Sequence, residues 1–177
     1  MFLFDLLFGK KTEPAHPAAQ PQPRPHAEED HVAPGTGIHH HPDLIVKFTQ
    51  DHQELLHLYT LVHAAATAGN VGLASERLED FRSALQSHLL TENIRLYVYL
   101  EHALQSDPPS HALMHQFRHE MDEIGKAVVA FLTKYQDLAE HPEWAQNFLT
   151  ELDGIGKVLG KRIQSEEKTL YPLYLPM

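Results

Sequence analysis

The sequence predicts an all-α protein, an antiparallel up-down-up-down four-helix bundle behind a disordered N-terminal arm rich in Pro and His. From residue 43 onward, apolar residues recur with the 3.6-residue period of amphipathic helices. Gly, Pro and Asn divide this region into four long segments with short connections. No segment alternates apolar and polar residues as a half-buried strand does. We therefore expect two parts, the arm at residues 1–42 and the bundle at residues 43–177.

The first two helices are bounded by residues that start and stop helices. Asp43 follows Pro42 and offers an N-cap for the first helix. The Gly-Asn-Val-Gly sequence at residues 69–72 ends that helix, and the Ser-Asp-Pro-Pro sequence at residues 106–109 ends the second. The expected helices are residues 43–67 and 73–105.

The last two helices are bounded in the same way. Ser110 can cap the third helix. His141-Pro142 separates it from the fourth, because Pro suits the first turn of a helix and not its interior. The fourth helix is expected to end before Pro172. The expected helices are residues 111–139 and 143–170.

The composition limits the classes of function. The chain has 177 residues, which fits one domain plus a tail. Its 24 acidic residues outnumber its 14 basic ones and give a net charge of −10, so we expect no nucleic-acid binding. It has no Cys, which excludes disulfides and Cys-ligated metals. Because no apolar run is long enough for a transmembrane segment, we expect a cytoplasmic protein.

The arm consists of two segments of different character. Residues 1–11 (MFLFDLLFGKK) are apolar and then basic. We expect a loose tail that docks on the bundle or on a protein partner, with weak membrane contact as the alternative. Residues 12–42 hold seven of the 12 Pro and six of the 15 His, so we expect a disordered linker whose His side chains are solvated. The run His39–His41 would bind a metal only weakly, because it lacks fixed geometry.

Several ionisable side chains fall inside the apolar stripes of the helices. At about 100° per residue, three of the four helices each turn at least one such group toward the core. Buried charged groups need partners or a metal, and the cores of helix bundles hold metals with His and Glu. These inward residues are His52 on the first helix, His88 and Glu92 on the second, and Arg162 and Glu166 on the fourth, with Glu167 on the flank.

The third helix carries a tempting ligand pair that faces the wrong way. His115 and His119 form an HxxxH motif, but they lie about 180° from the apolar stripe of their helix. Phe117 and Met121 face the core instead, and these residues suit packing. We therefore expect His115 and His119 on the surface, where such a pair could bind zinc weakly, and treat them as the less favoured metal ligands.

Three short motifs together resemble the hemerythrin-like, or HHE cation-binding, family. They are Asp51-His52, His88-Leu-Leu-Thr-Glu92, and the segment from Arg162 to Pro172 that ends in Leu-Tyr-Pro. The resemblance covers about residues 43–173. It implies a non-haem di-iron centre that binds or senses oxygen, nitric oxide or redox state. Arg162 stands where the family has a ligand His, and Arg cannot ligate a metal.

The number of inward ligands decides between three readings. A di-iron centre needs about six or seven protein ligands. The inward residues suffice for one metal ion, and the family resemblance implies that this ion is iron. In the metal-free alternative, Arg162 replaces the metal and its guanidinium forks onto Glu92 and Glu166. Residues 85–100 also resemble one helix of the regulator of sigma D, a metal-free helical bundle that binds a sigma factor.

We expect a small bacterial protein with a sensory or regulatory role and not an enzyme. The nucleophile elbow, the P-loop and the dinucleotide-binding glycine motif are all absent from the sequence. The tyrosines near the motifs are interpreted as packing residues with a polar tip. They are Tyr97, Tyr99, Tyr171 and Tyr174.

Overall fold

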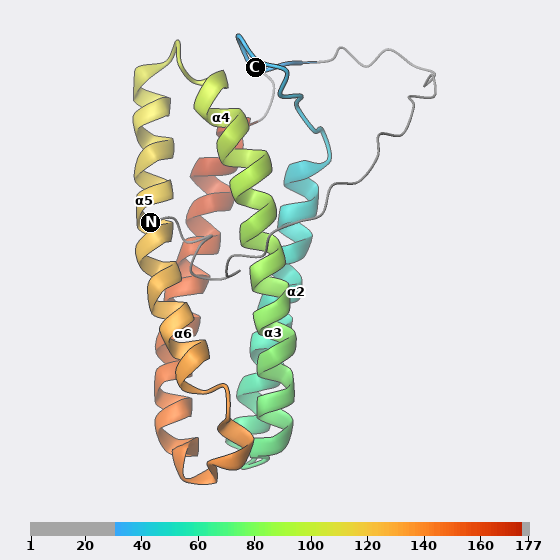
Figure 1. Cartoon of the computed structure of the whole chain (residues 1–177), viewed down its shortest axis with the longest axis vertical. Coiled ribbons are helices and arrows are strands. Elements are labelled where there is room, and N and C mark those ends of the chain that lie inside the picture. Colours follow the sequence, from blue (N-terminus) through green and yellow to red (C-terminus); the bar gives the residue numbers. More distant parts are fainter. Residues whose placement is uncertain (1–30, 175–177) are drawn as a thin grey trace, which may run out of the picture.

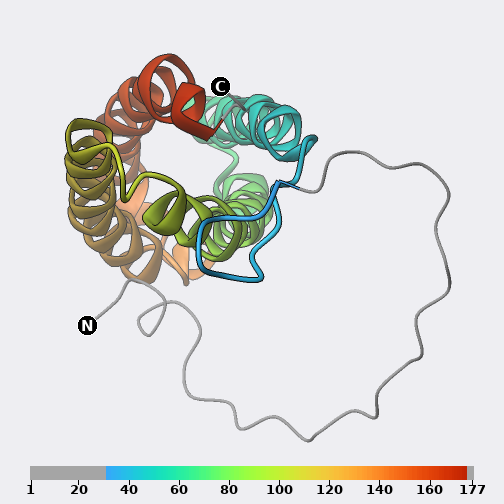
Figure 2. The same ribbon diagram turned by 90° about the horizontal axis from the view of Figure 1, so that it is seen from above.

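The structure is a computed structural model that describes residues 31–174, and its long helices lie side by side and antiparallel (Figures 1 and 2). The expected four-helix bundle is confirmed. Helix α3 continues through a π-helical segment into α4, and α6 continues through a second π-helical segment and a final 3₁₀ turn. The helices are α2 (Leu44–Thr67), α3 (Val71–Thr91) with Glu92–Tyr97 and α4 (Val98–Ala103), α5 (Pro108–Lys134), and α6 (Ala145–Ser165) with Glu166–Leu170 and Tyr171–Tyr174.

The caps explain where the helices begin. The side chain of Asn70 accepts a hydrogen bond from the Leu73 amide, so α3 begins two residues earlier than expected. Asp107, and not Ser110, is the N-cap of α5, with its carboxylate 3.4 Å from the Ser110 amide. The two prolines that end the preceding helix therefore form the first turn of α5, where a missing N–H has no cost. Helix α5 ends at Lys134, and two 3₁₀ turns, Leu138–Glu140 and Pro142–Trp144, lead to α6.

The apolar core is divided into two clusters along the bundle. The larger cluster fills the end where α2 joins α3, and it includes Leu55, Leu89 and Phe131. The smaller cluster fills the end near α4 and includes Phe48, Leu96 and Leu170. The inward polar residues of α2, of α3 with its continuation and of α6 with its continuation lie where these two clusters meet, so apolar side chains flank them along the bundle.

The last residues of the arm contact the α4 end of the bundle, which corrects in part the expectation of a solvated linker, since His31, His39 and His41 are exposed as expected. Ala33 is buried, and an isolated bridge joins Val32 to His39. The His40 Nε2 donates to the Tyr174 carbonyl at 3.0 Å, and its ring stacks on the Tyr174 ring. The His41 amide donates to the Tyr174 hydroxyl at 2.8 Å. Tyr174 therefore accepts the two hydrogen bonds that join His40 and His41 to the end of the last helix.

The remaining predictions about the arm concern residues outside the described part of the chain. These residues are the apolar tip at residues 1–11 and the linker up to residue 30. Among the helices within residues 31–174, none combines the length and apolar character of a membrane span.

Candidate metal centre

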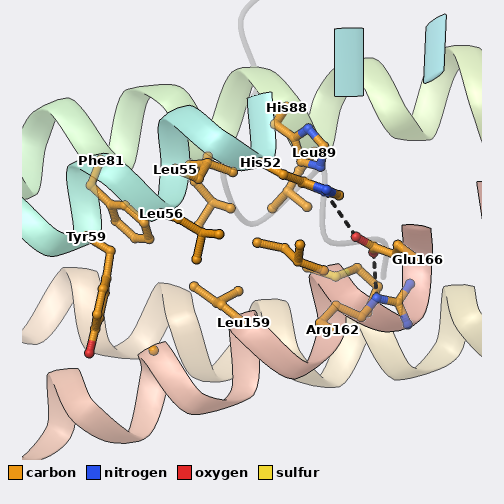
Figure 3. A pocket seen from close by; sticks show the side chains of 14 residues that line it. His52, Leu55, Leu56, Tyr59, Phe81, His88, Leu89, Leu159, Arg162 and Glu166 are labelled. Carbon is orange, nitrogen blue, oxygen red and sulfur yellow. Dashed lines mark hydrogen bonds and ion pairs between the residues drawn. The ribbon is translucent and has the colours of Figure 1, made fainter. Parts of the chain in front are cut away.

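Five ionisable side chains are buried in the middle of the bundle, and Figure 3 shows four of them, His52, His88, Arg162 and Glu166. All five are at most 5% exposed. Helix α2 supplies one, α3 and its π-helical continuation supply two, and α6 with its continuation supplies two. The structure thus encloses the residues that the helical period turns inward. They are His52, His88, Glu92, Arg162 and Glu166.

Three of these side chains converge closely enough to share one ion. Ligand atoms of His52, His88 and Glu166 all lie within 4.8 Å of one another. The His52 Nε2 lies 3.3 Å from the Glu166 Oε2, and the two imidazole rings are 4.8 Å apart between centroids. Two imidazoles and a carboxylate from three helices form a donor set that iron or zinc accepts.

The outer nitrogen of each imidazole is paired with a carboxylate. The His52 Nδ1 lies 2.8 Å from the Glu167 Oε1, and the His88 Nδ1 lies 3.4 Å from the Asp51 Oδ2. Metal-binding His residues usually donate the second ring N–H in this way, which fixes the tautomer and leaves the other nitrogen for the metal. Glu167 is 37% exposed and contacts the outer side of His52, so it orients the ring and lies outside the converging cluster. Asp51, which sequence reasoning noted only as a neighbour of His52, plays the same part for His88.

Each inward carboxylate begins a π-helical segment. Glu92 opens Glu92–Tyr97, and Glu166 opens Glu166–Leu170. Such segments hold one extra residue per turn and often occur at functional sites. Both carry the same pattern, an acidic residue followed by Leu and Tyr at the fourth and fifth positions (Glu-Asn-Ile-Arg-Leu-Tyr and Glu-Glu-Lys-Thr-Leu-Tyr). This repeat was the signal that could have assigned Tyr97 and Tyr171 to the site.

The two tyrosines do more than pack. The Tyr171 hydroxyl lies 3.1 Å from the His52 Nε2, and the Tyr97 hydroxyl accepts a hydrogen bond from the Arg162 Nη2 at 3.0 Å. Tyr99 and Tyr174 lie elsewhere, at the α4 end with His40. Each Tyr of the repeat therefore contacts one buried ionisable residue on another helix, Tyr171 contacting His52 and Tyr97 contacting Arg162.

Arg162 takes a different set of partners from the fork expected in the sequence. Its Nε donates to the Glu166 Oε1 at 2.5 Å, and its guanidinium lies over the Phe117 ring at 4.7 Å. The Nη1 lies 3.6 Å from the Glu120 Oε2. The expected second branch to Glu92 is wrong, since the buried Glu92 Oε1 has no hydrogen-bond partner. In the repeat, Arg162 precedes its Glu by four residues as His88 does, so a cation occupies the place of a ligand.

The pKa values of the two buried carboxyl groups are shifted in opposite directions. Burial and the nearby charge of Glu166 raise the pKa of Glu92 well above its usual value, so Glu92 favours the neutral form. Burial also opposes ionisation of Glu166, but His52 and Arg162 outweigh it and lower the pKa of Glu166. One anion and one neutral acid therefore face the same interior, and Glu92 keeps an unused oxygen.

The pKa values of the two buried imidazoles are also shifted in opposite directions. Burial disfavours protonation of His52, yet hydrogen bonds to Glu166 and Glu167 outweigh burial and raise its pKa. Burial, followed by the charge of His52, lowers the pKa of His88 to about 4. His88 is therefore neutral at pH 7 and retains a lone pair for a cation.

Helix α5 contributes apolar side chains to the centre. Met114, Phe117 and Met121 face the core, whereas His115 and His119 are exposed. The helical period predicted this orientation. The two His residues of the HxxxH motif are consequently remote from the converging cluster of His52, His88 and Glu166.

A small apolar cavity of about 30 Å³ adjoins the cluster, which has room for a molecule of one or two heavy atoms (Figure 3). Leu55, Phe81 and Leu159 line it, and His52 and Glu166 form its polar side. The ring of Tyr59 lies directly on Gly156, where a Cβ atom would come within 2.3 Å of it. Only Gly at position 156 allows the ring to close against α6 in this way.

A bundle that turns His and Glu inward from three helices belongs to the class of helical-bundle metal-binding proteins. The model of the hemerythrin HHE cation-binding domain matches residues 43–174, and the chain belongs to this family. Comparison with curated proteins and with solved structures gave no match.

Membership of this family implies metal binding, and the residues present fit one ion. Three donors converge, and Glu92, outside this group of three, has a buried carboxyl oxygen without a hydrogen-bond partner. The residues do not fit two ions, because α5 turns Phe117 and Met121 inward and Arg162 brings a positive charge to the site. The buried Glu92 carboxyl favours the neutral form and leaves this oxygen without a partner, and a cation beside it would stabilise its ionised form.

Proposed function

We propose that the bundle binds a single iron ion between His52, His88 and Glu166, with Glu92 as a fourth ligand. The convergence of three ligand atoms within 4.8 Å carries this proposal. Iron bound there would supply a centre that changes redox state and coordinates a small ligand. The enclosed position, away from the exposed His of the arm and of α5, favours one specific ion over adventitious binding.

The surrounding residues hold the donors in place. Glu167 and Asp51 fix the orientation of the two imidazoles through their outer nitrogens. Arg162 holds one oxygen of Glu166 and leaves the other directed at His52. The Tyr171 hydroxyl can supply or accept a hydrogen bond beside the His52 Nε2.

The role that we propose is sensory or regulatory and non-enzymatic, in a bacterial cytoplasm. The cavity beside the cluster has room for a diatomic molecule such as oxygen or nitric oxide but not for an organic substrate. Because Arg162 stands close to the ligands, a di-iron oxygen carrier is the less favoured alternative. A sensor requires only that ligand binding or oxidation alter the packing of the helices that hold the site.

Iron content per chain tests the single-ion proposal. The full-length protein would be purified without oxygen and its iron measured by elemental analysis, for the wild type, His88→Ala and the matched control His119→Ala. We expect His88→Ala to lose one iron relative to the wild type and His119→Ala to lose none. The comparison removes any contribution from the arm, which is identical in all three proteins. A difference of two irons, or no difference, would contradict the proposal.

Glu92→Gln adds a test that separates ligation from folding. Because the raised pKa keeps Glu92 neutral, Gln is close to it in both shape and charge. We expect the variant to keep the thermal unfolding midpoint of the metal-free protein while binding iron more weakly. Unchanged iron affinity would remove Glu92 from the ligand set.

A metal-free regulator is the second candidate, favoured by the 2.5 Å contact between the Arg162 Nε and Glu166. In that case the guanidinium takes the electrostatic part of the ion, and the bundle surface binds a protein partner as sigma-factor-binding bundles do. A wild-type protein that is cooperatively folded and contains no iron would select this candidate.

A further inference from the structure

Three metal-binding side chains meet at the surface where α4 and α5 adjoin, away from the core cluster. Glu101 comes from α4, and His111 and His115 come from successive turns of α5. These two helices lie side by side at the end of the bundle that carries the arm (Figure 1). One carboxylate oxygen, the Glu101 Oε1, lies 3.2 Å from the His111 Nε2 and 3.3 Å from the His115 Nε2.

The spacing of these donors matches a tetrahedral ion. Zinc binds nitrogen and oxygen at about 2.0–2.2 Å, which places tetrahedral ligands roughly 3.4 Å apart. The two observed separations are close to this value and lie at or beyond the long end of the N–H···O range. The two rings are edge-to-face, 4.5 Å apart between centroids, so both present the Nε2 to the same oxygen.

The surroundings leave this position accessible and compatible with a cation. The side chains of His111, His115 and Glu101 are 29%, 48% and 34% exposed, so water can complete the coordination. Arg118 is the nearby positive group, and it approaches the other oxygen of Glu101, at 4.0 Å. The Oε1 therefore remains the oxygen that faces the imidazoles.

The HxxxH motif at His115 and His119 is not this site. His119 has the same i, i+4 spacing to His115, but among residues 31–174 the structure brings together Glu101, His111 and His115 as the surface group of three donors. The carboxylate from the neighbouring helix distinguishes the pair at positions 111 and 115 from the pair at 115 and 119.

We propose that Glu101, His111 and His115 form a Zn²⁺ site with a water as fourth ligand, separate from the core centre. The ion joins α4 to α5 across the turn at residues 104–107. Because two ligands are on α5 and the third is on α4, the site exists only when the two helices are docked. Zinc binding consequently stabilises the folded α4–α5 junction.

Zinc binding by the full-length protein tests the site. Bound Zn²⁺ would be measured by equilibrium dialysis for the wild type, Glu101→Gln, His115→Ala and the matched control His119→Ala. We expect His115→Ala to lose one zinc per chain, Glu101→Gln to bind that zinc more weakly, and His119→Ala to retain it. All four proteins keep the core residues and the arm, so zinc bound there contributes equally. Circular dichroism would check that each variant is folded.

Thermal unfolding gives a second readout. Zn²⁺ should raise the unfolding midpoint of the wild type by more than that of His115→Ala, because the ion binds only the docked helices. Equal loss of zinc in His115→Ala and His119→Ala would place the ion on α5 alone and overturn the proposal. Equal zinc content in all four proteins would also overturn it and leave an ion pair between Glu101 and two imidazoles.

Discussion

Replacing Arg162 by Met should strongly destabilise the metal-free protein. The substitution keeps an unbranched side chain but removes the guanidinium, which contacts Glu166 and the Tyr97 hydroxyl and lies over the Phe117 ring. Removing one partner of a buried ion pair costs about 3–5 kcal/mol. Glu166 keeps His52 as a second partner, so we expect the lower end, about 3 kcal/mol. For a chain of this size, that corresponds to a fall of roughly 6–12 °C in the unfolding midpoint.

The assay is urea unfolding in the presence of a chelator, followed by circular dichroism. Lys161→Met is the matched control, since Lys161 is exposed and its loss should change the unfolding free energy by less than about 0.5 kcal/mol. In a Glu166→Gln background, Arg162→Met should cost clearly less than in the wild type. A cost below about 1 kcal/mol in the wild type, or the same cost in both backgrounds, would refute the buried ion-pair reasoning.

Two further predictions concern pH and packing. Because the pKa of His88 falls from 6.5 to about 4 in the folded metal-free protein, only the unfolded chain gains this proton between those values. The unfolding free energy should therefore decrease by about 3 kcal/mol more in the wild type than in His88→Gln as the pH falls from 6.5 to 4; parallel profiles would contradict this. Gly156→Ala should destabilise the wild type by about 1–2 kcal/mol but stabilise Tyr59→Ala by up to about 1 kcal/mol, because Ala favours helix once the ring is gone. Urea unfolding of the four proteins checks the change of sign.

The fold could be predicted from the sequence because the helix-breaking residues fall at the ends of the segments in which apolar residues recur with the helical period. Prolines at the end of the second helix show the limit of that reasoning. In the sequence, Pro108 and Pro109 indicate the end of one helix. In the structure they also form the first turn of the next helix, α5, which Asp107 caps. A helix end and a helix start carry overlapping signals when the connection is short.

Within one helix, a helical wheel with a constant angle predicts which residues face inward only up to a π-helical segment. The wheel placed His88 and Glu92 inward, and both are buried. At the same angle per residue, the inward stripe of the second helix continues to Tyr99, whereas Tyr97 is buried and Tyr99 is half-buried in the structure. The segment Glu92–Tyr97 contains an extra residue per turn, so the face that points inward shifts along the sequence.

The partners of the inward residues could not be read from the sequence. Helical period gives the direction of a side chain but not the distance to groups on other helices. The sequence predicts that Arg162 contacts Glu92 and Glu166, whereas in the structure it contacts Glu166, Tyr97 and Glu120. The residues that orient the imidazoles, Asp51 and Glu167, depend on how α2 packs against α3 and α6, which only the assembled bundle defines.

The contact between the arm and Tyr174 gives the protein a mechanical property. His40 and His41 connect the incoming chain to the end of the last helix, so a pull between residues 31 and 174 would act on these contacts and on the hydrogen bonds within residues 31–40. Tyr171 lies three residues before Tyr174 and hydrogen-bonds to His52. Tension applied through the arm therefore reaches the candidate metal centre within a single turn of backbone.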